Sequence, residues 1–157
     1  MSPVFIDPDA FLEIEGVRVW TPERSAEAWR LAREALRAAL RTAVATGSVR
    51  GVVVVCGLQG AGKSTRIARQ ERDTATVYVD AVPTSARHRA SVIAIARGFG
   101  APADAVWIRT LLPVALERNQ QRPLDGRVPE ASIRSVDRLF ELPTSAEGFA
   151  SIRIVES

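Results

Sequence analysis

The chain has 157 residues, of which 46% are hydrophobic and 25% are charged. That length suits one compact domain with its own core, and that balance is ordinary for a soluble globular protein. No stretch approaches the roughly 18 apolar residues of a membrane-spanning helix, and the first residues show no secretory signal pattern. The single cysteine, Cys56, excludes an internal disulfide. We therefore expect a cytoplasmic protein that makes no membrane contact.

The positive charge of the chain comes almost entirely from arginine. The formal net charge is +3, and Lys63 is the only lysine among 21 basic residues. A slender ammonium group reaches between phosphate oxygens where a planar guanidinium does not fit. The solitary lysine is either an accident of composition or the mark of a position that requires an ammonium group, and its place in the sequence, described below, favours the second explanation.

The first predicted elements are a hairpin and a long helix. Residues 11–14 and 17–20 flank a two-residue turn that contains glycine, which predicts a short β-hairpin. A helix is expected after Thr21, an N-cap residue followed by proline, and its end is expected near Ala45, before Gly47. The side chains expected on its buried face are Trp29, Ala32, Leu36, Leu40 and Val44.

The same helix carries a second stripe, formed by Arg30, Arg33, Arg37 and Arg41. Such a stripe can contact nucleic acid. It can also be a solvated face, because Glu27 and Glu34 lie three and four residues from Arg30. We favour the solvated face, since runs of charge usually keep a helix surface in water.

From residue 51 onward, apolar strands alternate with helical segments. The expected strands are residues 52–56, 76–79, 105–109 and 151–155. The expected helices are residues 62–72 and 85–97, a helix that opens at Pro113, and residues 129–141. This alternation is typical of an α/β protein with helices on both faces of a parallel sheet. We predict one domain over residues 1–157, in which a hairpin-helix extension (1–48) precedes the α/β core (51–157).

The first strand of this core runs directly into a glycine-rich loop with the spacing G-x-x-x-x-G-K-S. This spacing is a Walker A motif, and a buried strand before it and a helix after it give the motif its meaning. Backbone N–H groups and the helix start form an anion nest, Lys63 neutralises the β and γ phosphates, and Ser64 ligates Mg²⁺. The residues expected to contact a nucleoside triphosphate, in particular ATP, are Gly57, Gln59, Gly60, Ala61, Gly62, Lys63, Ser64 and Thr65.

The fold class that follows is a kinase-like P-loop NTPase, a three-layer sandwich around a short parallel sheet. Asp80 ends the apolar strand 76–79, which is the Walker B arrangement. A carboxylate there can hold Mg²⁺ at the carboxyl edge of the sheet, together with Ser64. Strand-ending aspartates also serve as helix caps and turn formers, but beside a Walker A motif we favour the metal role.

Two arginines follow the expected strand 105–109. Arg118 and Arg122 lie four residues apart, so they are expected on one helix face, just before a turn that contains proline and glycine. Arginines in that place suit a lid over a nucleotide, because they stabilise charge on the transferred phosphoryl group. Arg127 could join them, and plain surface arginines are the alternative.

A family resemblance appears at this point. The stretch Arg118-Asn119-Gln120-Gln121-Arg122, followed by Val128-Pro129 and Ile133-Arg134, resembles the lid of polynucleotide 5′-kinases, a group that also includes zeta-toxin-like P-loop kinases. Residues 140–149 are similar to the C-terminal end of that family, and Asp80-Ala81 with Arg87 and Arg89 to the strand-turn-helix before the lid. The resemblance covers roughly residues 51–155. It implies that Lys63 and Ser64 contact phosphate and Mg²⁺, that Asp80 is an active-site acid, and that Arg118 and Arg122 act on the donor phosphates.

One feature of the resembling family is missing. In the family, a strand and helix before the strand equivalent to 76–79 carry the acidic general base. Only 16 residues separate Lys63 from Asp80 here, and the helix expected over residues 62–72 uses most of them. A further parallel strand needs a crossover of about a dozen residues or more, so that extra unit cannot be present. Asp80 or Asp73 could substitute as base. We expect the N-terminal hairpin to occupy the sheet edge that the absent strand leaves open.

Together these features favour a Mg²⁺-dependent kinase that moves the γ-phosphate of ATP to a hydroxyl acceptor, such as a nucleic-acid 5′ end. Its catalytic residues would be Lys63, Asp80, Arg118 and Arg122. Two alternatives remain open, because the segment with the general base is absent. One is a nucleotide-binding module that has lost its acceptor site, and the other is a simple NTPase that transfers the phosphate to water.

Overall fold

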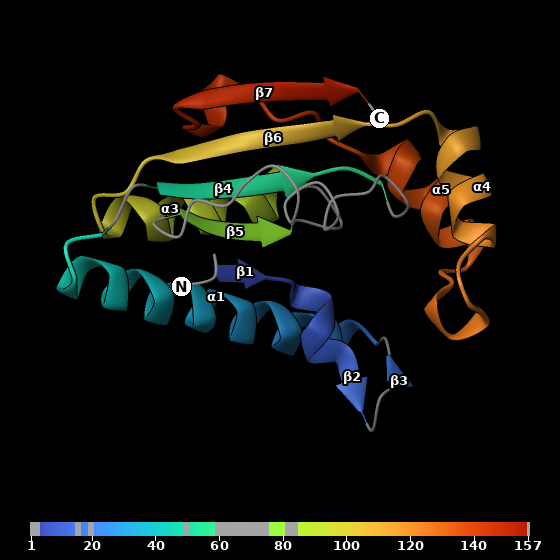
Figure 1. Ribbon diagram of the computed structural model, residues 1–157, viewed down its shortest axis with the longest axis horizontal. Coiled ribbons are helices and arrows are strands. Elements are labelled where there is room, and N and C mark those ends of the chain that lie inside the picture. Colours follow the sequence, from blue (N-terminus) through green and yellow to red (C-terminus); the bar gives the residue numbers. More distant parts are fainter. Residues whose placement is uncertain are drawn as a thin grey trace.

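A computed structural model describes residues 4–14, 17–18, 21–48, 51–58, 76–80 and 85–156. Figure 1 shows a five-stranded sheet whose strands all run in the same direction, in the order β1-β5-β4-β6-β7. The strands are β1 (Val4–Ile6), β4 (Gly51–Cys56), β5 (Thr76–Asp80), β6 (Ala103–Arg109) and β7 (Ser151–Glu156). The α/β class with a parallel sheet, predicted from the sequence, is confirmed.

The central strands are continuous apolar runs because both of their faces are buried. Alternate side chains of β4 point to opposite faces, so Val52 and Val54 belong to one apolar cluster and Val55 to another. The second cluster also contains Tyr78 and Val106 from the neighbouring strands. The helix expected over residues 62–72 lies outside the described residues.

Two helices, α1 (Pro22–Ala45) and α3 (Ala86–Gly98), cover one face of this sheet. Helix α1 begins as predicted, because the Thr21 side chain accepts a hydrogen bond from the backbone N–H of Arg24 at 3.1 Å. Its buried side chains are Ala28, Trp29, Ala32, Leu36 and Leu40. All of them except Ala28 share one cluster with Val92 and Ile93 of α3. No helix among the described residues is both long and apolar enough to cross a membrane.

Two expectations for α1 can be compared with the structure. Val44, predicted to be buried, is 49% exposed. The helix has 24 residues and is therefore about 36 Å long, whereas a six-residue strand spans about 20 Å, so the last turn runs past the sheet. The solvated face agrees with prediction: exposed Arg30 forms hydrogen bonds with Glu27 and Glu34.

The N-terminal edge of the sheet differs from prediction. Strands β2 (Glu13–Ile14) and β3 (Val17–Arg18) pair antiparallel, as the predicted hairpin requires, but they form a separate two-stranded sheet. Residues 11–12, predicted as part of the first strand, belong to a 3-10 helix instead. The edge position beside β5 is instead occupied by β1, a three-residue strand that the sequence pattern does not predict. The physical reason is that an edge can be covered by any short β-forming segment with free backbone groups, and Val4, Phe5 and Ile6 have high β-propensity.

Helices α4 (Leu112–Gln120) and α5 (Glu130–Leu139) pack against each other beyond the carboxyl ends of the strands (Figure 1). The short 3-10 helix η2 (Leu124–Gly126) lies in the turn between them. A tail that contains a further 3-10 helix, η3 (Ser145–Glu147), then leads back to β7.

The tail is fastened to α3 by a buried ion pair. The side chain of Arg89 is 0% exposed and that of Glu147 is 13% exposed. Arg89 Nε donates to Glu147 Oε1 at 2.8 Å and Arg89 Nη2 donates to Glu147 Oε2 at 3.2 Å, a two-pronged geometry. Burial alone would raise the pKa of Glu147, but hydrogen bonds from Arg89 and from the Thr144 backbone outweigh it and hold this pKa below its usual value. Arg89 therefore has a structural partner.

Candidate functional site

The sheet order defines a topological switch point between β4 and β6. From β4 the chain continues to β5 on one side, and it later returns to form β6 on the other side of β4. In open α/β sheets, ligands bind at the carboxyl ends of the strands where the order reverses. Gly57 and Leu58, the first two residues of the glycine loop, leave β4 at this edge. The fold therefore starts the loop where a nucleotide site is expected.

The remaining predicted phosphate contacts, residues 59–65, lie outside the described residues, and with them Lys63 and Ser64. Their roles stay predictions. Leu58 is described, and it is buried in a small core with Ala115 of α4 and Ile133 of α5. The start of the loop and the two helices beyond the strand ends thus share one apolar contact.

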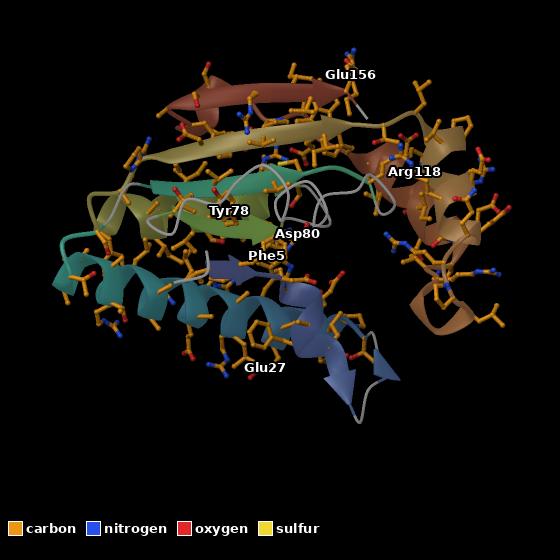
Figure 2. The ribbon with its side chains drawn as sticks, viewed as in Figure 1. Phe5, Glu27, Tyr78, Asp80, Arg118 and Glu156 are labelled. Atoms are coloured by element: carbon orange, nitrogen blue, oxygen red, sulfur yellow. The ribbon has the colours of Figure 1, made fainter. Side chains whose placement is uncertain are left out.

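Asp80 lies at the end of β5, directly beside the strand that leads into the loop. It pairs in register with Val55, two residues before Gly57. Asp80 is only 8% exposed, and Figure 2 shows its position at the carboxyl end of β5. Burying a carboxylate is costly unless it is compensated by partners or by a cation. The placement is the one expected for a Walker B acid.

The two arginines predicted to act from a lid lie in different backbone conformations, one in a helix and one after its end. Arg118 is half-buried in the last turn of α4 and lies in the helical region beyond the strand ends (Figure 2). The expectation that Arg122 shares its helix face is wrong, because α4 ends at Gln120 and Arg122 follows the C-cap. Pro123 is the cause, since the residue before a proline is disfavoured in helical conformation. Arg122 is exposed, and its guanidinium has no hydrogen-bond partner in the part of the chain that the structure describes.

Asn119, for which the sequence alone indicates no role, holds the loop after α4. Asn119 is 5% exposed. Its Nδ2 donates to the carbonyl oxygen of Val128 at 2.7 Å, and its Oδ1 accepts from the backbone N–H of Val128 at 2.9 Å. The loop is tied further by Arg127 Nε, which donates to the carbonyl oxygen of Arg122 at 2.9 Å. The side-chain amide of Asn119 therefore clasps the nine-residue loop that contains Arg122 and Arg127.

Replacing Asn119 by leucine is expected to loosen this loop. The change keeps the branching of the side chain but removes both hydrogen bonds to Val128, and two hydrogen bonds with unsatisfied partners cost about 2–4 kcal/mol. A urea titration measures this loss of stability. The neighbouring change Gln120→Leu, at an exposed position on the same turn, serves as the control. Equal stability of the two variants would contradict the clasp.

A small cavity of about 50 Å³ lies at the switch point. Its lining residues are Gly57, Leu58, Trp107, Ile108, Arg109, Thr110, Asp137 and Phe140. The buried Thr110 hydroxyl has no hydrogen-bond partner among the described residues. Ligand pockets usually measure about 300–1,000 Å³, so this cavity can take a water molecule but not a nucleotide.

The oxygen ligands of the described site suit a magnesium ion only if a bound phosphate supplies further ligands. Mg²⁺ is generally held by one or two carboxylates together with substrate phosphates and water. Within the described segments no group of three or more His, Cys, Asp or Glu residues could hold a metal ion. Asp80 offers one buried carboxylate at the carboxyl edge of the sheet, and Ser64 would add a hydroxyl. A phosphate-bound Mg²⁺ fits this set, whereas a dedicated protein cage does not.

The fold is that of an α/β protein with a parallel five-stranded sheet, and the Walker A sequence follows its strand β4. Residues 67–143, slightly less than half of the chain, match the family model AAA_33, an AAA domain. The matched segment begins after the glycine loop and includes Asp80, Arg118 and Arg122. No curated protein matches the sequence.

Solved structures of one complex have a similar fold. The crystal structure of AvrRxo1-ORF1:AvrRxo1-ORF2 with ATP has a TM-score of 0.50 at 14% identity, over 74% of this chain and 56% of that chain. The structure of the same pair with sulphate ions has a TM-score of 0.50 at 14% identity, over 78% and 57%. This chain therefore spans a little over half the length of those chains. At such identity the likeness concerns the fold alone.

Proposed function

We propose that this protein binds ATP with Mg²⁺ and transfers the γ-phosphate to a hydroxyl acceptor. The observation that carries the proposal is the register of β4 and β5, which sets Asp80 beside the strand that enters the Walker A sequence. The AAA domain match and the solved neighbour with ATP support a nucleotide at this edge. The proposal extends to the glycine-loop residues from Gly57 to Thr65 as the phosphate cradle.

Each remaining residue of the proposed site has a separate task. Lys63 places an ammonium between the β and γ phosphates, while Asp80 and Ser64 hold Mg²⁺. When bound, the ion supplies positive charge that offsets the negative charge of the phosphates. Arg118 and Arg122 lie on and just after α4, from which guanidinium groups can reach the transferred phosphoryl group. Asn119 keeps the loop that carries Arg122 in one conformation.

The acceptor class follows from the resemblance to polynucleotide 5′-kinases and zeta-toxin-like kinases. We propose a nucleic-acid 5′-hydroxyl as the first acceptor to test, in a cytoplasmic setting. A second candidate function, hydrolysis or simple nucleotide binding, is favoured by one observation. The crossover from β4 to β5 is too short for the segment that carries the general base in the resembling family.

An experiment with γ-labelled ATP, Mg²⁺ and a panel of 5′-hydroxyl oligonucleotides separates these functions. Label on an oligonucleotide is the expected result and supports the kinase. Free labelled phosphate without labelled oligonucleotide indicates an NTPase. Calorimetric binding of ATP with no turnover indicates a binding module, and the absence of ATP binding would overturn the whole proposal.

A further inference from the structure

The edge strand β1 brings a second carboxylate to the carboxyl edge of the sheet. β1 and β5 pair in parallel, with Val4 opposite Val77, Phe5 opposite Tyr78 and Ile6 opposite Val79. The next residue in each segment is an aspartate, Asp7 after Ile6 and Asp80 after Val79. The sequences V-F-I-D and V-Y-V-D are therefore aligned side by side. Figure 2 shows Phe5 of β1 next to the end of β5 where Asp80 lies.

The backbone around Asp7 is fixed on both sides. Before it, Ile6 is buried against the sheet. After it comes the 3-10 helix η1 (Pro8–Leu12), in which Pro8 and Leu12 are buried. The guanidinium of Arg24 in α1 donates to the carbonyl oxygen of Leu12 at 3.0 Å and ties η1 to the long helix. The backbone at Asp7 is therefore held in place by packed segments on both sides.

One carboxylate oxygen of Asp7 is engaged and the other is available. Oδ1 accepts a hydrogen bond from the backbone N–H of Asp9 at 2.9 Å, which orients the carboxylate. Oδ2 has no hydrogen-bond or ion-pair partner among the described residues. The residue is half-buried, so solvent or a substrate can still reach it. An oriented carboxylate with one oxygen free of described partners has the chemical group that a general base needs.

We infer that Asp7 is the general base of the phosphoryl transfer, an assignment that rests on the proposed function. The acceptor hydroxyl oxygen forms a bond to the γ-phosphorus of ATP, and the bond from that phosphorus to the β–γ bridging oxygen breaks. The bridging oxygen keeps the electron pair and leaves as part of ADP. The proton of the hydroxyl moves to Oδ2 of Asp7 and from there to solvent.

Among the residues that the structure describes, the other acids near this edge are less suited to that task; Asp73 lies outside the described residues. Asp80 is the proposed Mg²⁺ ligand, and a carboxylate that binds a cation is a weaker proton acceptor. Glu156, at the end of β7, is paired with Arg109. Asp137 lies on α5 and lines the cavity between β4 and β6, on the opposite side of β4 from Asp80. Asp7 follows the strand next to β5, has no ion-pair partner in the described part of the chain, and is not proposed as a metal ligand.

The inference also explains how the chain works without the segment that its crossover is too short to hold. The sheet position beside β5 is filled by β1, which precedes the glycine loop in sequence instead of following it. Parallel pairing then carries the residue after β1 to the same edge as the residue that ends β5. A carboxylate reaches the acceptor side of the site from the N-terminal part of the chain.

The test is the change Asp7→Asn in the full chain. Asparagine keeps an oxygen that can accept the Asp9 N–H, so the local backbone is preserved while the base is removed. With γ-labelled ATP and a 5′-hydroxyl oligodeoxynucleotide, kcat for transfer is expected to fall by about 100-fold or more. The KM for ATP and the melting temperature are expected to stay at the wild-type values. The matched control is Asp9→Asn, which makes the same charge change two residues away and is expected to leave kcat unchanged.

The outcomes distinguish the two claims. Transfer by Asp7→Asn within about threefold of wild type, when wild type is active, overturns the assignment of Asp7 and leaves the proposed function standing. An equal fall in Asp7→Asn and Asp9→Asn, or a lower melting temperature that accounts for the fall, also overturns it. A wild-type protein that binds ATP but neither labels the oligonucleotide nor releases phosphate overturns both. Where water is the acceptor, the same comparison is made on phosphate release.

Discussion

Replacing Lys63 by alanine is expected to lower ATP turnover by about 100-fold or more, because the ammonium offsets charge on the β and γ phosphates in the ground and transition states. The same change is expected to weaken ATP binding measured by calorimetry. The melting temperature should not change, since the loop is predicted to lie at the exposed end of the sheet and to carry no core side chain at this position. Unchanged affinity for ATP in this variant would contradict the proposed phosphate site.

Two further variants separate the charge of Lys63 from its shape. Lys63→Arg keeps the positive charge but introduces a planar guanidinium that does not fit between phosphates in a tight loop. It is expected to lose turnover nearly as fully as the alanine variant. Arg41→Ala removes one positive charge at an exposed position on α1 and is expected to retain full activity. Full activity of Lys63→Arg would show that the loop needs only a cation.

Replacing Arg89 by methionine is expected to destabilise the fold by about 3–5 kcal/mol, because it leaves the partly buried carboxylate of Glu147 without its cation. The contact joins residues 58 positions apart, so its loss should release the tail from α3. The measurements are urea unfolding and the melting temperature, which should fall by roughly 10 °C for a chain of this size. A loss below about 1 kcal/mol would contradict a buried pair of this kind.

The pair can be isolated with a double-mutant cycle. Arg89→Met combined with Glu147→Gln removes both charges and is expected to recover much of the lost stability, since no unpaired charge stays buried. Arg87→Met, at an exposed position of the same helix, is the control and should be close to neutral. If the double variant is no more stable than Arg89→Met, the damage does not come from the uncompensated carboxylate.

The same pair predicts a dependence of stability on pH. The pKa of folded Glu147 lies below its ordinary value of 4.5. The unfolded chain therefore binds a proton at a higher pH than the folded chain does. Glu147 contributes its full stabilisation above about pH 4.5, and the contribution is lost as the pH falls through the folded pKa. In Arg89→Met this acid-side loss of stability should be smaller, as urea unfolding at several pH values would show.

Local patterns were sufficient to predict most elements. Thr21 and Pro22 mark the start of α1, the valine run marks β4, and Asp80 follows a short apolar strand, because caps, runs and turns depend on residues close in sequence. The predicted position of Asp80 beside the loop strand followed from a general property of parallel sheets, whose carboxyl ends meet at one edge. The boundaries were less accurate, as Arg122 shows, since a single proline moved the helix end.

Long-range pairing could not be predicted in the same way. Val4, Phe5 and Ile6 form too short a run to indicate a strand alone, and they become one only because the edge of β5 offers unpaired backbone groups. Asn119 reads as an ordinary polar helix residue until the fold brings Val128 to its amide. The one available signal for Asp7 was the likeness of V-F-I-D to V-Y-V-D, which has meaning only once the two segments are paired.

The sequence by itself determined the α/β class and predicted a phosphate-binding loop, because the alternation of strands and helices and the Walker A spacing are properties of neighbouring residues. Only the tertiary structure decided which segment covers the sheet edge, what Arg89 binds, and which carboxylate stands beside Asp80. These depend on contacts between residues far apart in the chain. Which of several segments makes such a contact depends on the free energy of the whole folded core, and a local sequence pattern carries no information about that free energy.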